Sequence, residues 1–212
     1  MDRIIDKPTT SPHALEAKFG RRKFLKIISA AAASIGLSSS AMVKLVEAAE
    51  LGLKPSVIWL HFQECTGCTE SLLRTSHPDL AELILDLISL DYHETLAAAA
   101  GHQVEKSLHD AMEANKGKYV LIVEGAIPEK DGGIYCKVAG KTAIDSLNEV
   151  AAHAGAIIAL GSCASFGGIP ASGPNPTGAT GAPQILKDKT VVTIPGCPAN
   201  PYNLLGVVLQ YV

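Results

Sequence analysis

The stretch VIWLHFQECTGCTESLLR, residues 57–74, decides the fold that this sequence predicts. It begins as a short apolar run, passes through a C-x-x-C loop and continues in a helical pattern. Short apolar runs bounded by turn residues are typical of buried parallel strands, and ligands of open α/β sheets gather at the carboxyl ends of such strands. The two thiols of the loop therefore lie where a cofactor is expected.

The length and charge of the chain limit what it can be. It has 212 residues and a formal net charge of -3. A chain of this length can bury a full core without disulfides or metal ions, so stability does not explain its cysteines. The basic residues form no stripe of the kind that nucleic-acid binding requires. Nucleic acid is therefore not an expected partner.

Residues 1–49 are predicted to be an export signal that is cleaved. Arg21 and Arg22 precede a small, apolar stretch at 27–43, which is typical of a twin-arginine signal. That stretch is short and weakly hydrophobic for a transmembrane helix, so a permanent N-terminal anchor is the weaker alternative. Small residues near Ala48 indicate where cleavage occurs. The predicted destination is the bacterial periplasm, where disulfides can persist; association of the mature protein with a membrane is left open.

The remaining residues, 50–212, alternate between strand-like and helix-like patterns. Five alternating apolar runs and helical patterns predict an α/β domain with three layers, in which helices cover both faces of a five-stranded parallel sheet in flavodoxin-like order. Gly and Pro predict loops at 126–133 and 167–178. The predicted strands are 56–62, 87–92, 119–124, 156–161 and 190–194, and the predicted helices are 68–76, 79–85, 97–116, 142–153 and 202–212.

Four cysteines follow three of the predicted strands. Cys65 and Cys68 follow the first strand, Cys163 follows the fourth and Cys197 follows the fifth. Because the carboxyl ends of parallel strands share one edge of a sheet, four thiols that are far apart in sequence can meet there. Four thiolates suit either a tetrahedral zinc ion or an iron-sulfur cluster.

Spacing alone leaves several kinds of site open. Structural zinc sites usually use two close C-x-x-C pairs, whereas here one pair is joined by two single cysteines, which favours a larger guest such as an iron-sulfur cluster. A disulfide or a thioredoxin-like dithiol would use Cys65 and Cys68 but leaves Cys163 and Cys197 unexplained. Cys136 follows a glycine loop and is expected to be a partly buried free thiol. Of the histidines, His61 is the one expected next to the site.

Six motifs stand in order along the body of the chain: ECTGCTES at 64–71, LDYHET at 90–95, VEGAIP at 123–128, GSCASFGG at 161–168, PNPTGA at 174–179 and GCPANPYN at 196–203. Together with the export signal they resemble the motifs of one known family, the small, electron-transferring subunits of periplasmic nickel-iron hydrogenases. The motifs also appear in the family's order, and the resemblance covers the whole chain.

The resemblance implies that residues 50–212 form a flavodoxin-like domain holding a proximal 4Fe-4S cluster through Cys65, Cys68, Cys163 and Cys197. It implies a heterodimer whose large subunit carries the nickel-iron centre and performs the reversible oxidation of H2. This chain would relay electrons from that centre toward an external carrier such as a cytochrome. In the family, the glutamate matching Glu64 has been linked to proton transfer; the plain alternative is an exposed loop carboxylate.

The sequence departs from the family pattern in two ways. Oxygen-tolerant members carry two extra cysteines around the proximal cluster, but the matching positions here are Gly67 and Gly168, which implies the standard, oxygen-sensitive cluster type. Family members also continue into a C-terminal domain with a medial and a distal cluster, whereas this sequence ends at Val212. We therefore expect an N-terminal fragment. The competing hypothesis is a non-redox, zinc-stapled or disulfide-stapled flavodoxin-like binding domain.

Overall fold

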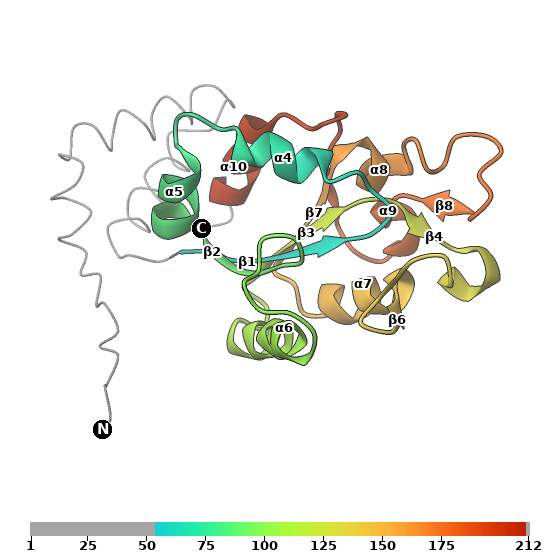
Figure 1. Ribbon diagram of the computed structural model, residues 1–212, viewed down its shortest axis with the longest axis horizontal. Helices are drawn as coiled ribbons and strands as arrows, with labels where there is room; N and C mark the ends of the chain where they lie inside the picture. The colour runs from blue at the N-terminus through green and yellow to red at the C-terminus, as the bar shows by residue number, and fades with distance from the viewer. Residues whose placement is uncertain (1–53, 211–212) are drawn as a thin grey trace, which may run out of the picture.

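A five-stranded parallel sheet forms the centre of the computed structural model, which describes residues 54–210. The strand order is β2-β1-β3-β7-β9, and every neighbouring pair runs parallel (Figure 1). This is the order of a flavodoxin-like sheet, so the predicted fold class is confirmed. The strands are β1 Ser56–His61, β2 Ser89–His93, β3 Val120–Glu124, β7 Ala156–Leu160 and β9 Val192–Ile194.

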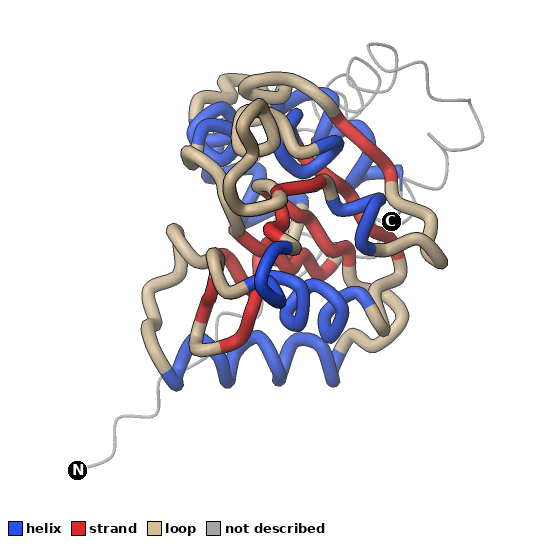
Figure 2. The backbone as a smooth tube through the Cα atoms, turned by 90° about the vertical axis from the view of Figure 1, so that its right-hand side faces the viewer, coloured by secondary structure: helices blue, strands red, loops and turns tan. Residues whose placement is uncertain are grey.

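Helices cover both faces of the sheet. In Figure 1, α6 and α7 lie below the strands, whereas α4, α5 and α10 lie above them. Figure 2 shows the same sandwich turned by 90°, with the strands between the helices. The helices are α4 Gly67–Leu73, α5 Leu80–Glu82, the π-helix η1 Leu83–Leu87, α6 His102–Ala114, α7 Ala143–Ala151, α8 Gly161–Phe166, α9 Ala182–Ile185 and α10 Pro201–Gln210.

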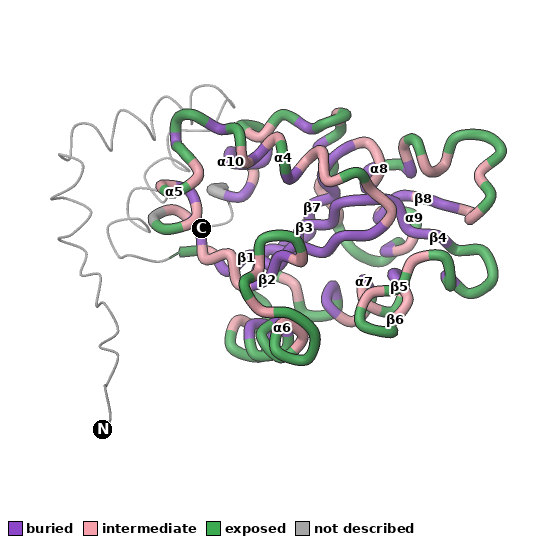
Figure 3. The backbone as a smooth tube through the Cα atoms, viewed as in Figure 1, coloured by how far each residue is buried: buried purple, intermediate pink, exposed green. Residues whose placement is uncertain are grey.

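β1, β3 and β7 are mostly apolar because both of their faces are buried (Figure 3). Successive side chains of β1 point to opposite faces, so Ile58 and Leu60 pack with the α6 and α7 side, whereas Val57 and Trp59 pack with the α4 and α10 side. The two hydrophobic clusters that result make the three predicted layers. Burial on both faces also explains why these strands appear as apolar runs in the sequence.

Two predicted loops contain short regular elements. Residues 126–133 include β4 Ile127–Pro128, which pairs antiparallel with β8 Ala179–Thr180, and the 3-10 helix η2 Lys130–Gly133. The segment 167–178 consists of turns and loop, as expected. A second small antiparallel pair joins β5 Lys137–Val138 to β6 Lys141–Thr142. These pairs form two separate two-stranded sheets and leave the topology of the five-stranded sheet as predicted.

One predicted strand ends earlier than the sequence suggests. β7 ends at Leu160, and Gly161 begins α8, a six-residue helix that the sequence analysis did not predict. The predicted export signal, residues 1–49, lies outside the described residues. Within residues 54–210, no helix combines the length and the apolar character that crossing a bilayer requires.

Tyr119 links the central strand to the end of α7. Its side chain is fully buried, and its hydroxyl donates a hydrogen bond to the carbonyl oxygen of Val150 in the last turn of that helix. The last carbonyls of a helix have no partner within the helix, so this bond satisfies a buried acceptor. Burial also raises the pKa of Tyr119 to about 12, which keeps the hydroxyl a donor at neutral pH.

We expect Tyr119→Phe to lower the free energy of unfolding by about 1 kcal/mol, because it removes the donor and leaves the Val150 carbonyl buried without it. Tyr135→Phe is the matched control: its hydroxyl bonds Asp131 at the surface, so its loss should change stability by less than about 0.5 kcal/mol. Urea unfolding of both variants measures the difference. Equal losses would show that the Tyr119 hydroxyl has no special role.

Candidate functional site

The four cysteines singled out in the sequence lie at the carboxyl edge of the sheet. Cys65 lies in the loop after β1 and Cys68 in the first turn of α4. Cys163 lies in α8, directly after β7, and Cys197 follows β9. Because β1, β7 and β9 belong to one parallel sheet, their carboxyl ends bring these three segments to the same edge.

Hydrogen bonds tie the three segments together. The backbone N–H of Ser162 donates to the carbonyl of Gly196 (2.8 Å), which joins the Cys163 helix to the Cys197 loop. The hydroxyl of Ser71 donates to the carbonyl of Ala199 (2.9 Å), which joins α4 to the same loop. The backbone N–H of Ala199 also donates to the sulfur of Cys68 (3.5 Å). The cysteines are therefore held by a connected backbone rather than by independent loops.

Two glycines let the backbone approach the thiols closely. A Cβ atom at Gly161 would lie 2.5 Å from the Cys68 sulfur, and one at Gly168 would lie 2.9 Å from the Cys163 sulfur. Both residues also have positive φ values, +81° and +51°, which side-chain-bearing residues rarely adopt. The space around the sulfur atoms thus depends on the absence of a side chain at these two positions.

The protein environment disfavours ionisation of the buried thiols. Burial raises the pKa of Cys68 to about 11, and the nearby Glu124, Cys163 and Cys65 act in the same direction. Burial also raises the pKa of Cys163, with contributions from Cys197 and Cys65. Cys65 and Cys163 therefore lie near Cys68, and Cys65 and Cys197 lie near Cys163. Metal coordination needs the thiolate form, so a bound cationic group is what would reverse this preference.

All five cysteines are free thiols, and the four at the edge are partly or fully accessible. Among the described residues, no three of their sulfur atoms lie within 4.8 Å of one another. Sulfur ligands of one tetrahedral zinc ion would be about 3.8 Å apart, given Zn–S bonds of about 2.3 Å. Cys136 packs partly buried against the core beside α7, as expected of a free thiol outside the site.

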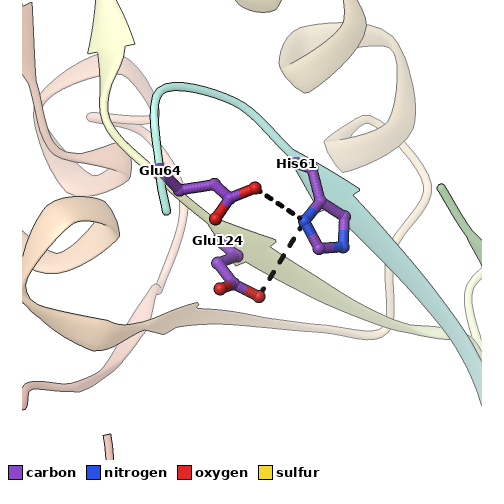
Figure 4. Close-up of side chains that lie close together, drawn as sticks. All are labelled: His61, Glu64 and Glu124. Carbon is purple, nitrogen blue, oxygen red and sulfur yellow. Dashed lines mark hydrogen bonds and ion pairs between the residues drawn. The ribbon is translucent and has the colours of Figure 1, made fainter. Parts of the chain in front are cut away.

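His61, Glu64 and Glu124 form a buried polar cluster beside the cysteine loop. His61 ends β1, Glu64 lies in the following loop and Glu124 ends β3, and the three side chains point toward one another (Figure 4). The Nδ1 atom of His61 lies 3.3 Å from Glu64 Oε1 and 3.9 Å from Glu124 Oε2. Among the described residues, this is the group whose nitrogen and oxygen atoms could surround a metal ion.

Glu124 makes this cluster a hydrogen-bond network and not a good cation site. Its Oε1 atom accepts from the backbone N–H groups of Cys68 (3.0 Å) and Thr69 (3.3 Å). Its Oε2 atom accepts from the Thr69 hydroxyl (2.7 Å) and from the indole N–H of Trp59 (3.1 Å). A carboxylate has about four lone-pair sites, and these four donors occupy them. No sequence motif assigned Glu124 a role, although its place as the charged last residue of the apolar strand β3 could have indicated one.

Glu64 keeps one oxygen free. Its Oε1 atom bonds His61 and the Thr66 hydroxyl, both at 3.3 Å, whereas its buried Oε2 atom has no hydrogen-bond partner among the described residues. Burial and the neighbouring Glu124 raise its pKa. Glu64 is therefore not the exposed loop carboxylate that was the plain alternative; its side chain is 12% exposed.

His93 and Glu94 extend the polar cluster toward the edge strand β2. His93 is buried and neutral, because burial and the nearby His61 lower its pKa to about 3. Its Nε2 atom lies 3.3 Å from the Thr69 hydroxyl. Since that hydroxyl donates to Glu124, the Nε2 atom of His93 carries the proton and donates to Thr69. Glu94 accepts from the backbone N–H of His61 (3.3 Å). The polar groups behind the cysteine loop thus form one continuous network.

Comparison with known protein families gives one match. Residues 65–211 match the family described as NADH ubiquinone oxidoreductase, 20 Kd subunit. The matched range begins at the first of the four cysteines and includes the other three, together with Glu124.

Several curated relatives are similar over most of the chain. The Hydrogenase-2 small chain of Escherichia coli K12 is 53% identical over 192 residues, which cover 91% of this chain and 52% of that protein. The Periplasmic [NiFe] hydrogenase small subunit 1 of Nitratidesulfovibrio vulgaris is 49% identical over 193 residues, which cover 90% of this chain and 61% of that protein. The chain thus spans about half the length of the curated relatives it matches.

Solved structures are similar as well. The recombinant [NiFeSe] hydrogenase of Desulfovibrio vulgaris Hildenborough, in its oxidized state, matches with a TM-score of 0.70 and 39% sequence identity. The match covers 74% of this chain and 58% of that chain. The fold is therefore shared with a solved hydrogenase chain.

Glu94 gives the site a measurable pH dependence. Burial raises its pKa to about 7, from an ordinary value of 4.5. Between these values the unfolded chain has lost the proton that the folded chain keeps, so the contribution of Glu94 to stability is full below about pH 4.5 and is lost as the pH rises through 7. In the Glu94→Gln variant no carboxyl group titrates at this position, so stability is not lost in this way as the pH rises. The stability of the variant relative to the parent protein should therefore rise between about pH 4.5 and pH 7.

Chemical unfolding at several pH values measures this difference. Glu113→Gln is the matched control, because Glu113 is an exposed residue of α6. It should leave the pH profile parallel to that of the parent protein. A Glu94→Gln profile that is also parallel would contradict the prediction.

Proposed function

The chain belongs to the family of the NADH ubiquinone oxidoreductase 20 Kd subunit, and from its likeness to hydrogenase small chains within that family we propose that it is the electron-transferring small subunit of a nickel-iron hydrogenase. In this proposal the large partner subunit carries the nickel-iron centre and performs the reversible oxidation of H2. This chain takes electrons from that centre and passes them toward an external carrier such as a cytochrome. The domain involved is residues 50–212.

The observation that carries the proposal is the set of four thiols at one edge of the sheet. We assign Cys65, Cys68, Cys163 and Cys197 as the residues that hold a proximal 4Fe-4S cluster. The connected backbone and the two glycines beside the sulfur atoms support this assignment. When bound, such a cluster supplies a one-electron redox couple whose potential depends on nearby charge and hydrogen bonds.

The protein's own contribution is to fix the positions of the proposed ligands. Cys68 is held by the N–H of Ala199 on its sulfur and by Glu124 on its backbone N–H. Cys65 and Cys197 are exposed, so the site opens toward solvent at the carboxyl edge of the sheet. A cluster bound there would face outward, as electron transfer from a docked subunit requires.

Glu64 is proposed as a proton carrier at the same surface. It stands beside Cys65, is mostly buried, and has an Oε2 atom that no described residue satisfies. A carboxyl group with one free oxygen next to a subunit interface can pass a proton across it. Glu64 would accept protons that the large subunit releases and would take no part in breaking the H–H bond.

Replacement of the proposed ligands tests the function. The complex purified anaerobically should contain iron and acid-labile sulfide, and the double variant Cys163→Ser, Cys197→Ser should lose the iron and sulfide of one cluster, because two of the four ligands to that cluster are removed. Cys136→Ser is the matched control and should keep the content of the parent protein, since Cys136 lies apart from the site. Metal analysis and visible absorption measure the outcome. Zinc in place of iron, or full iron content in the double variant, would overturn the proposal.

The periplasmic location is a separate proposal, based on Arg21 and Arg22 and on relatives that are named periplasmic. Replacing both arginines by lysine keeps the charge but removes the pair that the export receptor reads. We expect the periplasmic fraction of the protein to fall at least about tenfold, while the cytoplasmic fraction rises. Cell fractionation with immunoblotting measures this, and Lys23→Arg serves as the control. Unchanged export of the double-lysine variant would contradict the proposal.

A further inference from the structure

Glu124 is a buried carboxylate for which the proposed function has no stated use. It is 2% exposed and ends the central strand β3, whose other residues are all apolar. A carboxylate in such a place is strongly disfavoured unless its oxygen atoms are hydrogen-bonded. The structure therefore has to supply compensation, and the compensating groups come from the segment that carries Cys68.

All four donors to Glu124 are fixed by the fold. Two are backbone N–H groups at the start of α4, one is the Thr69 hydroxyl and one is the indole of Trp59. Each of these groups donates, and none needs a proton from Glu124. A carboxyl that only accepts has the hydrogen-bond pattern of the ionised form. Glu124 thus serves as a negative charge locked beside the cysteine loop.

The position of Cys68 depends on this charge. Its backbone N–H donates to Glu124 Oε1 at 3.0 Å, and the next residue, Thr69, is bonded through both its N–H and its hydroxyl. Thr66, at the N-cap of α4, has a φ of 62° and provides no side-chain cap for the helix. Glu124, from another strand, takes that role. The C-x-x-C loop is consequently anchored from outside its own segment.

We propose that Glu124 is the positioning residue of the C-x-x-C ligand pair and the fixed anion that lowers the reduction potential of the cluster these cysteines hold. The inference rests on the proposed function and adds that Glu124 controls the reduction potential of the cluster. Reduction adds an electron to the cluster, and a negative charge held nearby in a low-dielectric interior opposes that addition. The Thr69 and Trp59 donors offset part of the charge and so weaken its effect.

Two substitutions should shift the midpoint potential of the cluster in opposite directions. Glu124→Gln removes the charge and keeps a side chain of similar shape, so the midpoint potential of the cluster should move to a more positive value. We expect at least a tenfold change in the ratio of reduced to oxidised cluster at a fixed potential, which is about 59 mV for a one-electron couple. Thr69→Val removes one donor from Glu124 Oε2 but leaves the charge, so the midpoint should move to a more negative value.

The experiment is a redox titration of the anaerobically purified complex, followed by electron paramagnetic resonance of the reduced cluster. Glu113→Gln, the same chemical change at an exposed position of α6, is the control and should leave the midpoint unchanged. Iron and sulfide contents of each variant are measured in parallel. A merely structural role would change the cluster content but would not shift the midpoint in opposite directions.

The possible outcomes separate a failure of the role proposed for Glu124 from a failure of the proposed function. A Glu124→Gln variant with full cluster content and an unchanged midpoint overturns the role of Glu124 but leaves the proposed function intact. If Glu124→Gln fails to assemble a cluster, Thr69→Val decides, and a midpoint that does not become more negative overturns the inference. A parent complex that contains no iron-sulfur cluster overturns both the inference and the proposed function.

Discussion

The parallel hydrogen-bond ladder that joins β1, β3, β7 and β9 is the constraint on which the rest of the structure depends. It aligns His61 with Glu124 and Glu124 with Leu160, so that these strands end at the same level. Every loop that leaves this edge begins within reach of its neighbours. Residues separated by more than a hundred positions in the sequence become partners because the ladder fixes where their strands stop.

A site at such an edge places polar and charged side chains next to an apolar interior. The strands are buried on both faces, and their ends carry His61 and Glu124 into that interior. The protein satisfies Glu124 with donors from Trp59, Thr69 and the backbone of α4. The same bonds fix the cysteine loop. Stability and the geometry of the cysteine loop are therefore coupled in this region, because the segment that stabilises the buried Glu124 is the segment that carries Cys68.

Much of the fold could be predicted because the strands bury both faces. A strand covered on both sides reads as a nearly continuous apolar run, as in VIWL of β1 and VLIV of β3. The short elements were harder. α8 contains Gly161 and ends before Gly167, residues that predict turns, and its helical form follows from bonds such as that between Ser162 and Gly196. Such contacts join distant segments and leave no periodicity in the sequence.

The sequence by itself determined where the strands lie along the chain and which cysteines follow them, because apolar runs and cysteine spacing are local properties of the chain. It could not identify the partners of Glu124, since Trp59, Cys68 and Thr69 lie more than fifty positions away from it. Only the tertiary structure decided that this carboxylate is buried, accepts four hydrogen bonds and holds the C-x-x-C loop. The physical reason is that burial and hydrogen-bond satisfaction are set by whatever packs around a group, and in a parallel sheet those neighbours come from other strands.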